Sequence, residues 1–290
     1  MVLGMRKIFS YNTKYLLLHT IFFIFASTIV AIYPIVKEDA NQNYVLVSNI
    51  VLITYFFYIL VGYVINVVNF LRLRIIEFGS LEGQIKTDNV FRVAIANTFG
   101  AFYAYIYGII NHIFLFVSMS AFYLFVAEIY YAISLIKTYL VCNVNRIKYY
   151  QNRVDKIVIS FLFVLAISVV LCAITVYYNS GTFTKFSFLV FAYALYAFYA
   201  LISGVISFSR AHKTHNIVRE RFFIVKLACA IFSMYVLMVS LLNQFSTKPD
   251  LLPTYALIGG VVTGGLILTE AIIFLIWYIK NKQTNKKILQ

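Results

Sequence analysis

The stretch VAIANTFGAFYAYIYGIINHIFLFVSMSAFYLFVAEIYYAISLI, residues 93–136, is apolar almost throughout and decides the fold class. A transmembrane helix needs about 20 mostly apolar residues to cross the hydrocarbon layer of a bilayer. The stretch is too long for one crossing, so it predicts two helices, 93–110 and 113–136, joined by a tight turn at Asn111 and His112. A chain with such a stretch is expected to lie in a membrane.

The rest of the sequence has the same character. Of 290 residues, 62% are hydrophobic and 12% are charged, whereas a soluble domain carries about 25% charged residues. The N-terminal segment starts with basic residues, but its apolar part is too long for a signal peptide, so we expect it to remain as the first membrane helix. We predict an all-α, polytopic integral membrane protein with eight transmembrane helices: 15–36, 44–70, 93–110, 113–136, 157–178, 186–208, 223–243 and 254–279.

The basic residues predict the orientation. If the N-terminus is cytoplasmic, only Lys37, Lys185 and Lys248 of the 24 Lys and Arg residues fall on the outer side. An excess of Lys and Arg in cytoplasmic loops is the usual pattern of membrane proteins. We therefore expect both termini in the cytoplasm, a plasma-membrane location, and a basic cytoplasmic face that contacts anionic lipid headgroups. This pattern accounts for the net charge of +14, and no nucleic-acid partner is predicted.

One cytoplasmic loop is especially basic. It contains the sequence HKTH, residues 212–215, and the nearby cations Arg210, Lys213, Arg219 and Arg221. So much positive charge opposes metal binding, and we interpret these residues as a solvated surface.

The two halves of the chain resemble each other. FASTIVAIY (25–33) matches LAISVVLCA (165–173), FYILVGYV (57–64) matches FYALISGV (198–205), and FRVAIAN (91–97) matches VKLACAI (225–231). The series predicts an internal repeat, with four helices in residues 1–145 and four in 146–290. Since four is even, the two repeats would be parallel and related by an axis along the membrane normal.

The repeat brings Glu128 onto Glu270. Each lies nine or ten residues before a lysine, Lys137 or Lys280, which places it about 14 Å from the cytoplasmic end of its helix and near mid-bilayer. A charge there costs about 2.5–3.5 kcal/mol, so such acids are candidate functional groups. Apolar surroundings favour the uncharged form, and wetting favours the charged one. Each acid can therefore exchange a proton, or it can stay neutral and hydrogen-bond a neighbouring helix.

Other residues are predicted to line a pathway or to pack helices. Asn66, Asn69 and Asn97 are polar groups within spans and join the two glutamates as candidate substrate-binding or proton-binding residues. The spacing of small residues predicts close helix contacts at Gly100, Ala104, Gly108, Gly260 and Gly264. A tyrosine at every third position, Tyr193, Tyr196 and Tyr199, would line a pathway or contact lipid.

No enzyme motif accompanies these groups. The three cysteines form no CxxC pair, and no HExxH, GxSxG or phosphate-binding glycine motif occurs, so we predict no metal, no cofactor and no enzymatic activity. The favoured function is a small secondary transporter or permease that uses the intramembrane glutamates for proton or cation coupling. The alternative is a structural or regulatory membrane subunit that transports nothing and binds a partner subunit through its basic cytoplasmic face.

Overall fold

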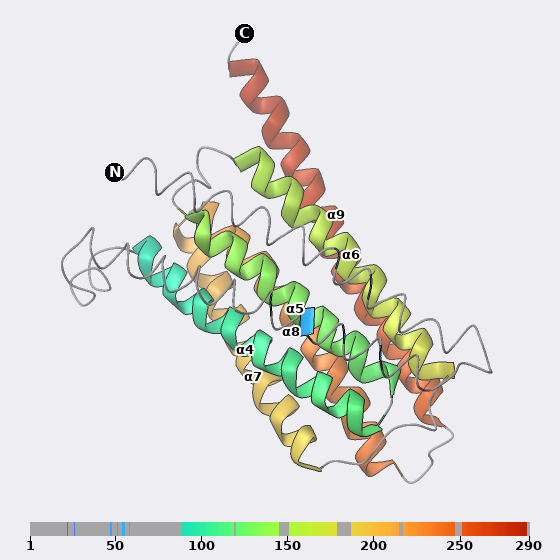
Figure 1. Ribbon diagram of the computed structural model, residues 1–290. Helices are drawn as coiled ribbons and strands as arrows, with labels where there is room; N and C mark the ends of the chain where they lie inside the picture. The colour runs from blue at the N-terminus through green and yellow to red at the C-terminus, as the bar shows by residue number, and fades with distance from the viewer. Residues whose placement is uncertain are drawn as a thin grey trace, which may run out of the picture. The chain divides into compact units, whose positions relative to one another are not determined.

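The computed structural model describes residues 22, 26, 47, 51, 54, 55, 58, 89–118, 120–144, 151–178, 187–214, 217–246 and 251–288. These residues form six long helices (Figure 1): α4 (Asn89–Ser118), α5 (Ala121–Cys142), α6 (Gln151–Tyr178), α7 (Ser187–Thr214), α8 (Ile217–Phe245) and α9 (Leu252–Ile288). No strand occurs in these ranges. Each helix contains a segment long and apolar enough to span a membrane, which confirms the all-α membrane fold class.

The count of eight spans remains a prediction. Its first two members, 15–36 and 44–70, lie almost entirely outside the described residues, where only single helical positions such as Phe22 and Val51 are defined. The other six predicted spans each correspond to one of the helices α4 to α9.

The predicted turn at Asn111 and His112 is wrong. Helix α4 continues through both residues to Ser118, and α5 begins at Ala121. Both side chains are buried, and the Tyr193 hydroxyl of α7 donates a hydrogen bond to Asn111 Oδ1. A polar side chain with a protein partner has no need of water, so these residues can lie within a helix. The membrane segments of this hairpin are therefore Val93–Leu115 and Phe122–Val141.

Residue contacts divide the chain into two compact units. The first contains residues 1–108 and 130–142, and the second contains 109–129 and 143–290. The second unit thus includes the tip of the α4–α5 hairpin, which the predicted boundary after residue 145 assigns to the first repeat.

Helices α4 and α5 run antiparallel within the first unit. The Ser134 hydroxyl donates to the Ala101 carbonyl over 2.8 Å, and the rings of Tyr105 and Tyr131 lie 5.6 Å apart. The ring of Tyr131 also lies against Gly108, where a Cβ atom would come within 2.1 Å of it. A larger residue at position 108 would therefore displace this tyrosine.

Helices α6 and α9 pack closely and antiparallel in the second unit (Figure 1). A Cβ atom on Gly260 would lie 2.1 Å from Ala173 Cβ, and one on Gly264 would lie 2.7 Å from Val170 Cγ2. Small residues allow two helix backbones to approach this closely. Helix α8 packs on both α9 and α7, and the Tyr196 hydroxyl of α7 contacts Cys229 Sγ of α8 over 3.3 Å.

The hairpins that contain the two glutamates differ in their helix lengths. Glu128 is the eighth residue of α5, whereas Glu270 is the nineteenth residue of α9. A shift that places Glu128 on Glu270 moves the α4–α5 turn to residues 261–262, which lie inside α9. The structure of these hairpins gives no support to the repeat, which remains a prediction from the sequence.

Candidate functional site

Glu270 has a buried carboxyl group on α9. Both of its carboxylate oxygens are inaccessible to solvent, and neither has a hydrogen-bond partner in the part of the chain that the structure describes. The side chains one turn away on either side, Ile267 and Phe274, are buried. An ionised carboxylate in such a place would be costly because no donor compensates the loss of water. The neutral, protonated acid is the form that these surroundings favour.

Glu128 lies on α5 and also belongs to the second unit. Its side chain is buried on α5, in the neighbourhood of the buried Cys172 thiol of α6. Tyr235 of α8 also lies in the neighbourhood of Cys172. The Tyr235 hydroxyl is buried and has no hydrogen-bond partner among the described residues. We call Glu128, Cys172 and Tyr235 the outer polar group.

The two acids lie at different depths. The Tyr235 hydroxyl would be 3.2 Å from a Cβ atom on Gly260, so the outer polar group is level with this part of α9. Glu270 lies ten residues farther along the same helix, or about 15 Å at 1.5 Å per residue.

Lys137 does not mark the end of the helix that contains Glu128, and the depth of Glu128 in a membrane remains a prediction. Lys137 is only 5% exposed and its ammonium group lies beside Gly100 of α4, within the membrane segment Phe122–Val141. Helix α5 also begins eight residues later than the predicted span. Glu128 consequently lies about 10 Å from the first residue of α5.

Of the three asparagines that the sequence offers as candidate binding residues, the structure describes one. Asn97 is buried on α4, where its amide nitrogen donates to the Val93 carbonyl over 2.7 Å. Its Oδ1 atom is buried without a hydrogen-bond partner in the described ranges. Asn97 belongs to the first unit and both glutamates belong to the second. Asn66 and Asn69 lie outside the described residues.

The small residues predicted to pack helices all lie in helices α4 and α9. Ala104 is fully buried on α4. A Cβ atom on Gly100 would find its nearest neighbour, Lys137 Nζ, at 3.7 Å, which is ordinary contact, whereas Gly108, Gly260 and Gly264 leave no such room. Of the tyrosine series on α7, Tyr193 and Tyr196 are buried and Tyr199 is exposed.

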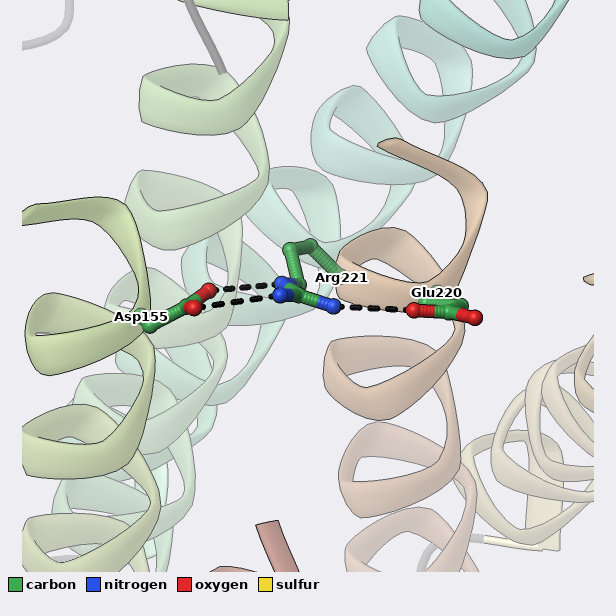
Figure 2. Close-up of polar contacts among 3 residues, drawn as sticks. All are labelled: Asp155, Glu220 and Arg221. Carbon is green, nitrogen blue, oxygen red and sulfur yellow. Dashed lines mark hydrogen bonds and ion pairs between the residues drawn. The ribbon is translucent and has the colours of Figure 1, made fainter. Parts of the chain in front are cut away.

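A buried ion pair joins α6 to α8. Arg221 Nε donates to Asp155 Oδ1 over 2.6 Å, and Nη2 donates to Oδ2 over 3.0 Å (Figure 2). A third bond, also 3.0 Å, runs from Nη1 to Oε2 of Glu220. The Arg221 and Asp155 side chains are 1% and 2% exposed, whereas Glu220 is 32% exposed. The paired geometry is the strongest that a guanidinium and a carboxylate can form.

Two aromatic rings of α9 complete the surroundings of Arg221. Its guanidinium carbon lies 5.1 Å from the centre of the Phe274 ring and 4.5 Å from that of the Trp277 ring. A cation over an aromatic face is attracted by the negative face of the ring. We call Asp155, Glu220, Arg221, Phe274 and Trp277 the Arg221 cluster. It joins α6, α8 and α9 at the end that the sequence predicts to be cytoplasmic, which we call the inner end.

The interpretation of Arg221 as part of a solvated basic surface is wrong, since its side chain is completely buried. Asp155 stands near the start of the fifth predicted span and Arg221 near the start of the seventh. In the predicted topology these two starts lie on the same side of the membrane. Opposite charges at equivalent ends of two spans are the signal in the sequence that would have indicated the pair.

Within the described ranges, no three His, Cys, Asp or Glu side chains come together in a way that can hold a metal ion. The candidate functional groups of the described residues are therefore the two glutamates and the Arg221 cluster. Comparisons with protein-family models, with curated proteins and with solved structures find no match to this chain.

Proposed function

We propose that this protein is a small secondary transporter or permease in which Glu270 binds and releases the coupling proton or cation. The observation that carries the proposal is the burial of both Glu270 carboxylate oxygens without any partner among the described residues. A glutamate that served only to fix helix packing would hydrogen-bond a neighbouring helix. Glu270 makes no such bond to the helices that the structure describes, and this favours a role in ion exchange over a role in packing.

The proposed coupling follows from the difference between dry and wet surroundings. In the dry state the carboxyl group keeps its proton, because a lone buried charge is expensive. When a conformational change admits water or a cation, the ionised carboxylate is stabilised and the proton leaves. The protonation of Glu270 and the conformation of the protein therefore depend on each other. A transporter that alternates between inward-open and outward-open forms requires such a dependence.

Glu128 is the second acid of the proposed pathway. It belongs to the outer polar group, whose Tyr235 hydroxyl lies beside Gly260, about 15 Å from Glu270 along α9. Under this proposal the ion passes between the outer polar group and Glu270 in sequence, and both acids contribute to transport.

Proton movement in liposomes tests the proposal. The purified protein is reconstituted with a trapped pH-sensitive dye, a potassium diffusion potential is imposed, and amino acids, sugars, nucleosides and organic cations are added in turn. We expect at least one class to drive proton entry in the wild type and Glu270→Gln to reduce that entry to the rate of protein-free liposomes. A wild-type rate in Glu270→Gln would remove Glu270 from the mechanism.

Thr269→Val is the matched control. Thr269 is exposed, and its hydroxyl donates to the Gly265 carbonyl of its own helix over 2.8 Å. This variant changes the residue next to Glu270 without touching the buried face, so its proton entry should equal that of the wild type. If no solute drives proton entry even in the wild type, and the protein isolates with a stoichiometric partner, the subunit function replaces the transporter function.

A further inference from the structure

Glu270 and the aromatic residues of the Arg221 cluster share one face of α9. Glu270, Phe274 and Trp277 are spaced by four and three residues, and residues so spaced lie above one another on a helix. Phe274 follows Glu270 by one turn, or about 6 Å. The guanidinium of Arg221 lies over Phe274, so the cluster is the next polar feature toward the inner end.

The Arg221 cluster holds more negative than positive charge. One guanidinium is shared between Asp155 and Glu220, and Glu220 is partly exposed to solvent. Arg221 therefore has a replaceable bond at the wetter side of the cluster. The bonds to Asp155 hold the start of α6 against the start of α8.

Arg221 is the cation best placed to respond to Glu270. The ammonium group of Lys226 on α8 donates to the Ser207 hydroxyl of α7 over 3.1 Å. This group is therefore bonded to α7, whereas Arg221 lies against α9. A guanidinium cannot lose its proton, so its charge is constant while that of Glu270 varies. The other titratable or charged groups on α9 and on the two helices packed against it near this face are Asp155 and Cys172 on α6, Glu220, Cys229 and Tyr235 on α8, and Tyr278 and Lys280 on α9.

We propose that Arg221 couples the ionisation of Glu270 to the opening of the inner end. With Glu270 protonated, Arg221 stays with Asp155 and Glu220, and the inner ends of α6 and α8 are held together. When Glu270 gives its proton to the inner solution, the new carboxylate draws Arg221 one turn along α9. Asp155 then loses its partner and the start of α6 moves away from α8 and α9.

The direction of this exchange follows from solvation. An ionised Glu270 has no donor in its dry surroundings, so it gains most from a cation. Asp155 and Glu220 lie at the inner ends of their helices, where water can solvate them once α6 has moved. This coupling rests on the proposed role of Glu270 and adds to it the residue that transmits the change.

A distance measurement between spin labels tests the coupling. Labels are placed at the exposed positions of Asn152→Cys on α6 and Lys280→Cys on α9, in the full chain with Cys142→Ser. Cys172 and Cys229 are buried and should not react with the label. In liposomes we expect the wild-type distance to lengthen as the pH rises, because Glu270 then loses its proton. Glu270→Gln should keep the short distance at every pH.

Two further variants make the test specific. Asp155→Asn weakens the bond that holds α6, so it should lengthen the distance already at low pH, whereas Thr269→Val should follow the wild type. The coupling is wrong if Glu270→Gln shows the wild-type lengthening, or if the wild type shows none. Loss of proton entry in Glu270→Gln with the lengthening preserved would remove Arg221 from the mechanism and leave the proposed function intact. Normal proton entry in Glu270→Gln would instead overturn the proposed function itself.

Discussion

Arg221 and Glu270 meet the cost of burial in two different ways. A guanidinium keeps its charge under all ordinary conditions, so a buried arginine needs a carboxylate and other favourable contacts. Arg221 has two carboxylates and two aromatic rings. A carboxyl group can become neutral instead, and Glu270 has no partner in the described structure. This contrast is the physical basis for assigning a permanent charge to Arg221 and an exchangeable proton to Glu270.

The Asp155–Arg221 pair predicts a strong effect of single substitutions. Asp155→Ala leaves a buried guanidinium without its main acceptor, and removal of one member of a buried pair costs about 3–5 kcal/mol. The loss should appear as a lower free energy of unfolding in a denaturant titration of the detergent-solubilised protein. The double variant Asp155→Ala, Arg221→Met has no unpaired charge and should recover most of the stability. Equal losses in the single and double variants would contradict the assigned role of the pair.

The sequence was sufficient to find the acids but not the ion pair. A glutamate within a long apolar segment is visible in the sequence alone, as Glu128 and Glu270 show. Asp155 and Arg221 lie at the polar ends of their helices, 66 positions apart, where charged residues are usually solvated. Their burial depends on how α6, α8 and α9 pack, and no local pattern reports this packing.

At the scale of the helix, the glycines of α9 decide how closely it approaches α6. Gly264 faces α6, where a Cβ atom would lie 2.7 Å from Val170 Cγ2 and 3.1 Å from the Ala166 carbonyl oxygen. A Cβ atom on Gly265 would have no described side chain or neighbouring helix within 4 Å. Substitutions at Gly264 and Gly265 therefore separate two effects on stability, that of the contact between α6 and α9 and that of helix propensity.

We expect Gly264→Ala and Gly265→Ala to change stability in opposite directions. Gly264→Ala forces the two helices apart, and overpacking of this kind costs about 1–3 kcal/mol. Gly265→Ala replaces glycine by the best helix former and gains up to about 1 kcal/mol. Thermal unfolding of the two variants in the same detergent measures the difference. A Gly264→Ala protein as stable as Gly265→Ala would show that α6 and α9 are not in close contact at this glycine.

Helix boundaries were predictable only where polar residues mark them. The ends of α6 to α9 coincide approximately with breaks in the apolar pattern, so the sequence located these helices. The end of α4 was missed because Asn111 and His112 resemble a turn in an apolar stretch. Tyr193, 82 residues away along the chain, supplies the hydrogen bond that lets Asn111 lie within the helix. Such a long-range partner is not visible in the local sequence.

At the scale of the whole molecule, the described structure consists of helices suited to a membrane. The six membrane segments range from 18 to 29 residues, enough to cross a hydrocarbon layer of about 30 Å or most of it. Many large apolar side chains on these helices are exposed, including Phe191, Leu195 and Ile273. In water such surfaces would favour aggregation, whereas lipid chains cover them at no cost.

The groups that take part in the proposed mechanism all belong to the second unit. The outer polar group, Glu270 and the Arg221 cluster follow one another along α9, in order toward the inner end. The predicted repeat placed the two acids at one depth around a central axis. In the structure the Tyr235 hydroxyl of the outer polar group lies beside Gly260 of α9, and Glu270 is about 15 Å farther along that helix.

The protonation of Glu270 within the membrane is the central claim, and infrared spectroscopy measures it most directly. The carbonyl-stretching band of a protonated carboxyl group is recorded at neutral pH, in water and in heavy water, for the reconstituted protein and for Glu270→Gln. We expect a band in the wild type that Glu270→Gln lacks and Thr269→Val retains. Identical spectra for the wild type and Glu270→Gln would mean that Glu270 is ionised in the membrane, which contradicts the account.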